Sequence, residues 1–161
     1  MQDKIHLIHT DYPLDLKQIL QDAEEASAIK ETYTDDRYDN QAVEGWDIAR
    51  WTSPYIEKIV NDFGFEKVKT SFYWQGPNIL LPPHIDYGST VTLNFVLTDK
   101  PAPITIDNVE YYYKQGLINS GVLHSVQNGN EPRLILKITV YDKTFEEVAE
   151  NLKWRKKEQS V

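Results

Sequence analysis

The stretch Leu81-Pro82-Pro83-His84-Ile85-Asp86-Tyr87-Gly88 places an imidazole and a carboxylate two positions apart, directly after a pair of prolines. On an extended backbone, residues i and i+2 point to the same face, so His84 and Asp86 converge while Ile85 turns away. A third side chain of this kind, His124, lies forty positions beyond His84. Two histidines and one carboxylate favour non-haem Fe(II) and leave coordination positions open. We therefore expect His84, Asp86 and His124 to bind a metal.

Arg133 is a candidate for binding an anion. It follows His124 by nine positions and opens the apolar run Leu134–Val140. An arginine one strand away from the metal ligands suits an anionic co-substrate, because its planar guanidinium matches the geometry of a carboxylate. The alternative is that Arg133 forms a structural ion pair.

Length, composition and charge limit the class of protein. A chain of 161 residues can bury a sizeable core, and we expect one domain over residues 1–161. The net charge of −8 argues against nucleic-acid binding, which depends on basic residues that neutralise phosphates. The absence of cysteine excludes disulfides and thiolate metal sites. There is no signal-peptide pattern and no apolar run of membrane-spanning length, so we expect no membrane partner and a cytoplasmic location.

Helices are predicted in three places. The apolar residues between Leu14 and Ile29 follow helical spacing, with acidic residues on the outer face. Ser53-Pro54 resembles an N-cap followed by proline at the first helical position, and Gly64 marks the end of that helix. Thr144 and Glu147 form a capping-box pattern, which predicts a short C-terminal helix.

The segment Thr32–Trp51 is polar and is predicted to be a long irregular loop. Such a loop inside a compact domain is often a lid or a binding loop. It contains Tyr33, Tyr38 and Trp46, and the alternative is that these aromatic side chains anchor the loop to the core.

From Val68 onward the hydrophobic period changes from 3.6 to 2, and Pro, Gly and Asn clusters separate short runs. This pattern predicts a mainly β protein: an antiparallel barrel or jelly roll, braced on one face by helices. The predicted strands are Val68–Trp74, Thr90–Leu97, Ile104–Ile106, Val109–Tyr113 and Leu134–Tyr141. The alternation of Ile5 and Leu7 with His6 and Ile8 predicts a further short strand ahead of the first helix.

Two strands have one polar and one apolar face. Thr92 and Asn94 alternate with Leu93 and Phe95, and Arg133 shares its face with Ile135, Lys137 and Thr139. A polar face usually meets bulk water, but it can also line a barrel interior that binds a ligand. Arg133 and the His84–Asp86 pair favour the second interpretation. Lys137 fits it poorly, and we expect its side chain to lie in water at the far end of the strand.

With these residues in view, the chain resembles the Fe(II)/2-oxoglutarate-dependent oxygenases. The resemblance covers about Val68 to Asp142 and depends on His84-Ile85-Asp86, a distal His124 and a basic residue after it. The phrases Thr92–Leu97 and Asn119–Asn128 are similar to aspartyl/asparaginyl β-hydroxylase-like proteins and to small phage and bacterial members.

The resemblance implies a double-stranded β-helix, a cupin-like jelly roll, in which His84, Asp86 and His124 bind Fe(II). Arg133 would then bind the far carboxylate of 2-oxoglutarate, with Tyr73 and Asn94 as helpers. The implied activity is hydroxylation of a protein side chain or a small amino-acid-like substrate by O2, with succinate and CO2 as co-products.

Two alternatives remain open at this point. One is a cupin-like metalloenzyme that does not use 2-oxoglutarate; Arg133 argues against it, because the arginine would have no evident anion to bind. The other is a non-catalytic barrel that binds a metal or a small acid.

Overall fold

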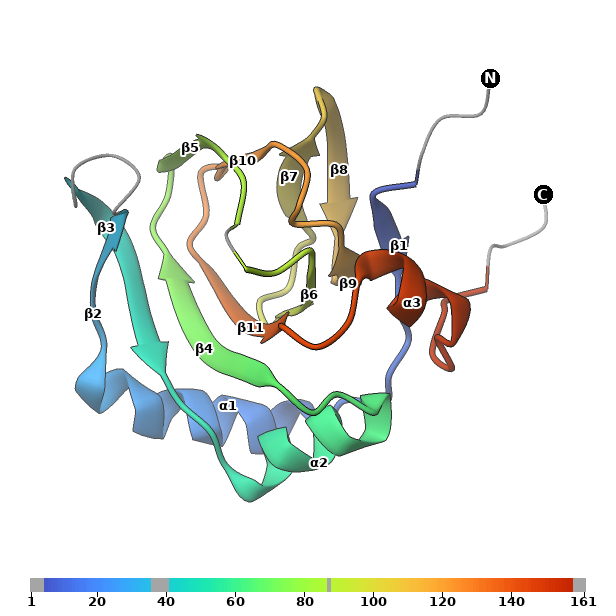
Figure 1. Cartoon of the computed structure of the whole chain (residues 1–161). Coiled ribbons are helices and arrows are strands. Elements are labelled where there is room, and N and C mark those ends of the chain that lie inside the picture. The colour runs from blue at the N-terminus through green and yellow to red at the C-terminus, as the bar shows by residue number, and fades with distance from the viewer. Residues whose placement is uncertain (1–4, 36–40, 87, 158–161) are drawn as a thin grey trace.

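The computed structural model describes residues 5–35, 41–86 and 88–157. Two antiparallel sheets face each other, and two helices lie against the outer face of the larger sheet (Figure 1). The larger sheet has the strand order β1 (Leu7–His9), β9 (Gln115–Ile118), β6 (Val91–Val96), β11 (Arg133–Val140), β4 (Val68–Gln75), β3 (Gln41–Arg50) and β2 (Glu31–Asp35). The smaller sheet has the order β5 (Leu80–His84), β10 (His124–Gln127), β7 (Ala102–Ile106) and β8 (Val109–Tyr113).

The three predicted helices are present, and α2 and α3 begin at the predicted capping residues. The Asp15 side chain accepts from Gln18 N to cap α1 (Leu16–Ala26), which a 3-10 turn at Ser27–Ile29 continues. Helix α2 (Pro54–Phe63) begins after Ser53 and ends at Gly64, whose φ of 77° is left-handed. The capping box is confirmed in α3 (Phe145–Glu150). None of the helices in the described ranges is long and apolar enough to cross a membrane.

The larger sheet is buried on both faces. One face packs against α1 and α2 through Phe72, Leu93, Phe95, Leu136 and Ile138, all of which are almost fully buried. The opposite face packs against the smaller sheet in a second apolar cluster: Leu7, Val96, Ala102, Ile104, Ile106, Tyr113, Ile118 and Ile135. The prediction that β6 and β11 each have an apolar and a polar face is therefore confirmed. The face that carries the polar residues is directed to the smaller sheet.

The prediction of a loop over Thr32–Trp51 is wrong. β2 and β3 form an antiparallel pair, and β3 continues the sheet through its pairing with β4. β2 is the edge strand of the sheet and β3 lies next to it. Polar residues are compatible with pairing there, and the polarity of this segment outweighed the β propensity of its Thr, Tyr, Val and Ile residues in the prediction. Tyr38 lies outside the described residues.

Besides β2 and β3, three strands were not among those predicted: β5, β9 and β10. β5 contains two prolines, which lower strand propensity, and β9 and β10 have only four residues each. Their pairing partners stabilise them: β9 lies between β1 and β6, and β10 lies between β5 and β7.

Asn128 connects the two sheets near the end of β4. Its Nδ2 lies 3.2 Å from the carbonyl oxygen of Gln75, 2.7 Å from that of Gly76 and 3.1 Å from that of Glu131. Asn128 is 1% exposed; its hydrogen bond to Gln75 is buried, and those to Gly76 and Glu131 are partly buried. Asn128 thereby positions the turn that leads from β10 into Arg133.

We expect Asn128→Ala to lower the free energy of unfolding by about 2 kcal/mol, because it removes one buried and two partly buried hydrogen bonds to main-chain carbonyl groups. Urea denaturation of both proteins measures this difference. Asn151→Ala is the matched control, since the exposed Asn151 side chain donates to a single carbonyl group, that of Glu147. The control is expected to change stability by less than about 0.5 kcal/mol, and equal effects of the two substitutions would contradict the role given to Asn128.

Candidate metal centre

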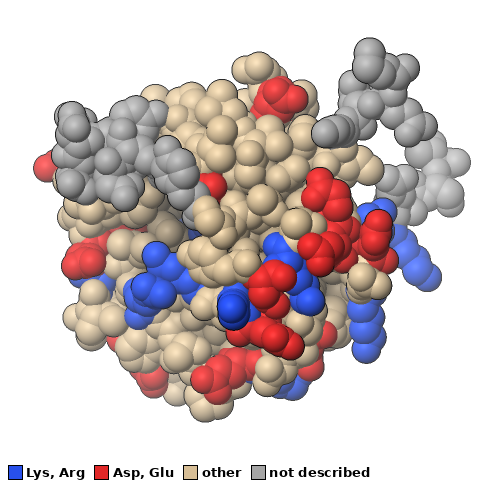
Figure 2. Space-filling view, viewed as in Figure 1, with Lys and Arg blue, Asp and Glu red and all other residues tan. Residues whose placement is uncertain are grey.

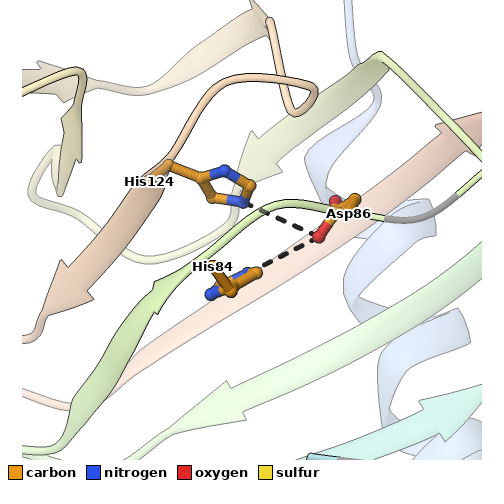
Figure 3. A group of neighbouring side chains, drawn as sticks. All are labelled: His84, Asp86 and His124. Carbon is orange, nitrogen blue, oxygen red and sulfur yellow. Dashed lines mark ion pairs between the residues drawn. The ribbon is translucent and has the colours of Figure 1, made fainter. Parts of the chain in front are cut away.

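The centre lies where β5 pairs with β10. His84 and His124 are direct partners across these two antiparallel strands, and their ring centroids are 4.3 Å apart. Figure 3 shows both imidazoles directed from neighbouring strands toward Asp86. Residues forty positions apart in the sequence are therefore brought side by side by main-chain pairing alone.

The orientation of each imidazole is set by its own strand. Nδ1 of His84 lies 2.8 Å from the carbonyl oxygen of Pro82, and Nδ1 of His124 lies 2.7 Å from that of Val122. A carbonyl oxygen can only accept, so each Nδ1 carries the proton in these hydrogen bonds. The Nε2 atom of each neutral ring then has its lone pair directed to the centre, which is the form that ligates a metal.

Asp86 completes the group. Its Oδ1 lies 3.5 Å from Nε2 of His84 and 3.7 Å from Nε2 of His124, and the three ligand atoms all lie within 4.8 Å of one another. The main-chain N–H of Asp86 donates to the carbonyl oxygen of Ser120, which ties the segment after β5 to the segment before β10. One carboxylate oxygen and two imidazole nitrogens thus face a common point, as a divalent ion requires.

Tyr73 and Asn94 line the same cavity as the three candidate ligands, so the structure brings five of the six predicted site residues together. Asn94 Nδ2 donates to the hydroxyl group of Tyr113 at 3.0 Å. Burial raises the pKa of Tyr113, although the hydrogen bond from Asn94 and the charges of Lys137 and Arg133 oppose this shift. Tyr113 therefore stays a neutral phenol at physiological pH and can donate a hydrogen bond into the cavity.

Arg133 is buried at the start of β11 but is not among the residues that line the cavity. Its Nε has no hydrogen-bond partner within the part of the chain that the structure describes. The charge of Arg133 acts on the Tyr113 hydroxyl group, which does line the cavity. The arginine thus lies behind the cavity wall with a donor available, and buried donors of this kind normally have an acceptor.

Lys137 is not in bulk water, and that expectation is wrong. Its Nζ lies 3.6 Å from Oδ2 of Asp86 and 5.6 Å from the ring centroid of Tyr73, and its side chain is 24% exposed. Burial alone would lower the pKa of Lys137, but the Asp86 carboxylate, together with Tyr73, Tyr33 and Tyr113, raises it above its usual value. The signal was present in the sequence, because Lys137 alternates with Ile135 on the cavity face of β11.

The cavity wall also contains residues from the β2–β3 hairpin. Tyr33 and Trp46 line the cavity, and the rings of Tyr33 and Tyr73 lie 6.0 Å apart. The indole N–H of Trp46, Gln75 Oε1 and Asn94 Oδ1 are buried without a hydrogen-bond partner among the described residues. The cavity therefore offers one donor and two acceptors to a polar ligand.

Among known proteins, similarity to this chain is found in solved structures and not in sequence. No family model and no curated protein sequence matches the chain. A prolyl hydroxylase from Trichoplax adhaerens, in complex with a hypoxia inducible factor oxygen degradation domain peptide fragment, has a TM-score of 0.64 at 14% identity, over 91% of this chain and 86% of that one. A Pseudomonas putida prolyl-4-hydroxylase has a TM-score of 0.58 at 14% identity, over 85% and 91%.

A third similar chain, from crystal structures of DMSP lyases, has a TM-score of 0.54 at 14% identity and covers 82% of this chain and 66% of that one. At these identities the likeness shows the fold. The protein is a double-stranded β-helix, a jelly roll of two facing antiparallel sheets, as the sequence predicted. The fold is the one found in the prolyl hydroxylases, and the His84–Asp86–His124 group is a candidate metal site within it.

We expect Lys137→Met to lower the free energy of unfolding of the metal-free protein by about 1–2 kcal/mol, between the values for exposed and buried ion pairs. The reason is that Asp86 loses a cation near its Oδ2. Mn(II) should then raise the melting temperature of the variant more than that of the wild type, because the ion no longer binds beside an ammonium group. Thermal denaturation with and without Mn(II) measures both effects.

The matched control is Lys100→Met, which removes an exposed ion pair with Glu131. It should change neither the metal-free stability nor the response to Mn(II). A Lys137→Met protein whose melting temperature responds to Mn(II) no more than that of the wild type would contradict the charge argument.

Proposed function

We propose that this chain is a single-domain Fe(II)- and 2-oxoglutarate-dependent dioxygenase that hydroxylates a protein side chain or a small amino-acid-like substrate. The observation that carries the proposal is the convergence of His84, Asp86 and His124 in a cavity between the two sheets. The fold in common with two prolyl hydroxylases supports it, and the peptide bound to one of them is consistent with a protein substrate.

Each residue of the centre has a defined part in this proposal. Nε2 of His84, Nε2 of His124 and Oδ1 of Asp86 would bind Fe(II) from one side and leave positions for 2-oxoglutarate and O2. When bound, these groups would supply the oxidation chemistry that hydroxylates a C–H bond, with succinate and CO2 as co-products. The hydrogen bonds from each imidazole Nδ1 to a main-chain carbonyl preserve the tautomer that ligation needs.

The other predicted residues would position the co-substrate. Arg133, whose Nε has no hydrogen-bond partner among the described residues, would bind the far carboxylate of 2-oxoglutarate at the end of the cavity where Tyr113 lies. Asn94 and Tyr73 would contact the co-substrate inside the cavity, since both side chains line it. The aromatic side chains of Tyr33, Trp46 and Tyr73 would exclude water from the reacting atoms.

A second candidate is a metalloprotein of the same fold that does not use 2-oxoglutarate, whether as an enzyme or as a non-catalytic binding barrel. The observation that favours it is the position of Arg133 outside the cavity lining. The two candidates differ in one measurable property, which is metal-dependent binding of 2-oxoglutarate.

We expect 2-oxoglutarate to bind the Mn(II)-loaded protein and not the metal-free protein in isothermal titration under anaerobic conditions. Arg133→Met should weaken this binding about tenfold or more, because it removes a charged hydrogen-bond donor. His124→Ala should abolish this metal-dependent binding of 2-oxoglutarate, because it removes a metal ligand. Arg155→Met, a substitution in the segment after α3, is the control and should leave the affinity unchanged.

An absence of binding to protein that demonstrably contains Mn(II) would remove the 2-oxoglutarate assignment and favour the second candidate. If Arg133→Met binds 2-oxoglutarate as tightly as the wild type, the co-substrate assignment stands, but a residue other than Arg133 binds its far carboxylate. Succinate release from the Fe(II)-loaded protein then tests turnover separately.

A further inference from the structure

Three cations lie on the inner face of the larger sheet, which is the face directed to the smaller sheet. We call Arg50, Lys69 and Lys137 the basic strip. Lys137 lines the cavity, and Lys69 has the same parity on β4 as the lining residues Tyr73 and Gln75. Arg50 has the same parity on β3 as Trp46, which also lines it.

Main-chain register places the basic strip together. Ser71 of β4 is the direct partner of both Arg50 on β3 and Lys137 on β11, and Lys69 is the partner of Thr139. The strip therefore crosses three adjacent strands within two rows of the sheet. Side chains in such positions are near enough for their charges to interact.

Within the strip, Lys137 has an acidic partner, Asp86, whereas Arg50 and Lys69 form no ion pair among the described residues. No carboxylate within the described ranges lies within ion-pair distance of Arg50 or Lys69, and Asp86 is the only acidic residue among those that line the cavity. Burial lowers the pKa of the Lys69 ammonium group, and Arg50 and Lys137 lower it further, while Asp86 opposes the shift. Three like charges at one place are unusual in a chain whose net charge is −8.

The open groove beside the start of α2 brings solvent to the strip, since Arg50 and Lys69 line it. Glu57 and Glu66 also line this groove, but neither forms an ion pair with the strip in the part of the chain that the structure describes. In Figure 2, Lys and Arg side chains appear across the middle of the face turned to the viewer, with Asp and Glu below them and to their right.

Arg133 begins β11, and the strip crosses the sheet farther along this strand. Arg133 pairs with Gln75 at one end, whereas Lys137 and Thr139 pair with Ser71 and Lys69 toward the other. Four residues of extended strand separate Arg133 from Lys137 by about 13 Å. A co-substrate that reaches toward Arg133 would therefore leave the strip available to the second reactant.

We propose that the substrate of this centre has a carboxylate group, which Arg50 and Lys69 bind beside Lys137. This inference rests on the proposed function, because it assigns the substrate class of the same site. The guanidinium and ammonium groups together provide charged donors that match a carboxylate. A dianionic phosphate would carry a second negative charge toward Asp86, so the single charge of a carboxylate suits the site better.

The test compares N-acetyl-L-aspartate α-amide, whose single carboxylate is on the side chain, with the neutral N-acetyl-L-asparagine α-amide. Both are added to Mn(II)-loaded protein saturated with 2-oxoglutarate, and paramagnetic relaxation of the probe protons reports binding near the metal. The acid should bind on the order of tenfold more tightly than the amide, as expected for charged hydrogen bonds. Lys69→Met and Arg50→Met should each remove most of this preference and leave the amide unaffected.

Lys17→Met is the matched control, because Lys17 lies on α1, on the other side of the larger sheet. It should retain the full preference for the acid. Circular dichroism checks that Lys69→Met and Arg50→Met are folded. If one of them does not fold, the other still tests the role of the strip. N-acetyl-O-phospho-L-serine α-amide is the third probe, and tighter binding of this phosphate than of the acid would overturn the carboxylate assignment.

The inference is also wrong if acid and amide bind equally, if neither is relaxed at millimolar concentration, or if the acid binds only by displacing 2-oxoglutarate. Failure of the proposed function is seen separately. If 2-oxoglutarate does not bind, the dioxygenase assignment fails, while the ratio of acid to amide binding on the Mn(II)-loaded protein still decides the role of the strip. If the protein takes up no Mn(II), both proposals are wrong.

Discussion

Antiparallel pairing between β5 and β10 is the constraint on which the rest of the site depends. This pairing makes His84 and His124 direct partners, and the main-chain carbonyl groups of Pro82 and Val122 then set the direction of both rings. Asp86 follows β5 by two residues and is tied through its N–H to Ser120, so the carboxylate reaches the same point. A shift of one residue in the β5–β10 register would direct the two imidazoles to opposite faces of the sheet.

The larger sheet gives this small site a rigid wall because both of its faces are buried. One face is apolar and packs on α1 and α2, and the other combines apolar residues with a few polar ones that face the centre. Lys137 and Asn94 are cross-strand partners on that inner face, and Ser71 lies beyond Lys137 on β4. Polar groups in such a position cost free energy unless they have partners, and several of them lack one among the described residues. A ligand that forms hydrogen bonds with these polar groups would gain the most binding free energy.

Much of the fold was predictable because its signals are local. The capping residues at Asp15, Ser53 and Thr144 bond to main-chain groups within three positions of themselves. The period-2 pattern of β4, β6 and β11 also reflects neighbours along the chain. The β2–β3 hairpin was not predicted, because its signal is not local. β3 pairs with both β2 and β4, and polar strands at and next to a sheet edge have little hydrophobic alternation along the chain.

The sequence by itself determined the candidate ligands, the polar face of β6 and β11, and the jelly-roll architecture, since residue type and alternation express all three. Only the tertiary structure decided the environment of each charge. Arg133 and Lys137 lie on the same face of one strand, yet Lys137 contacts Asp86 inside the cavity while Arg133 lies behind its wall. The physical reason is that the environment of a charge depends on residues far away in the sequence, which sheet packing brings near.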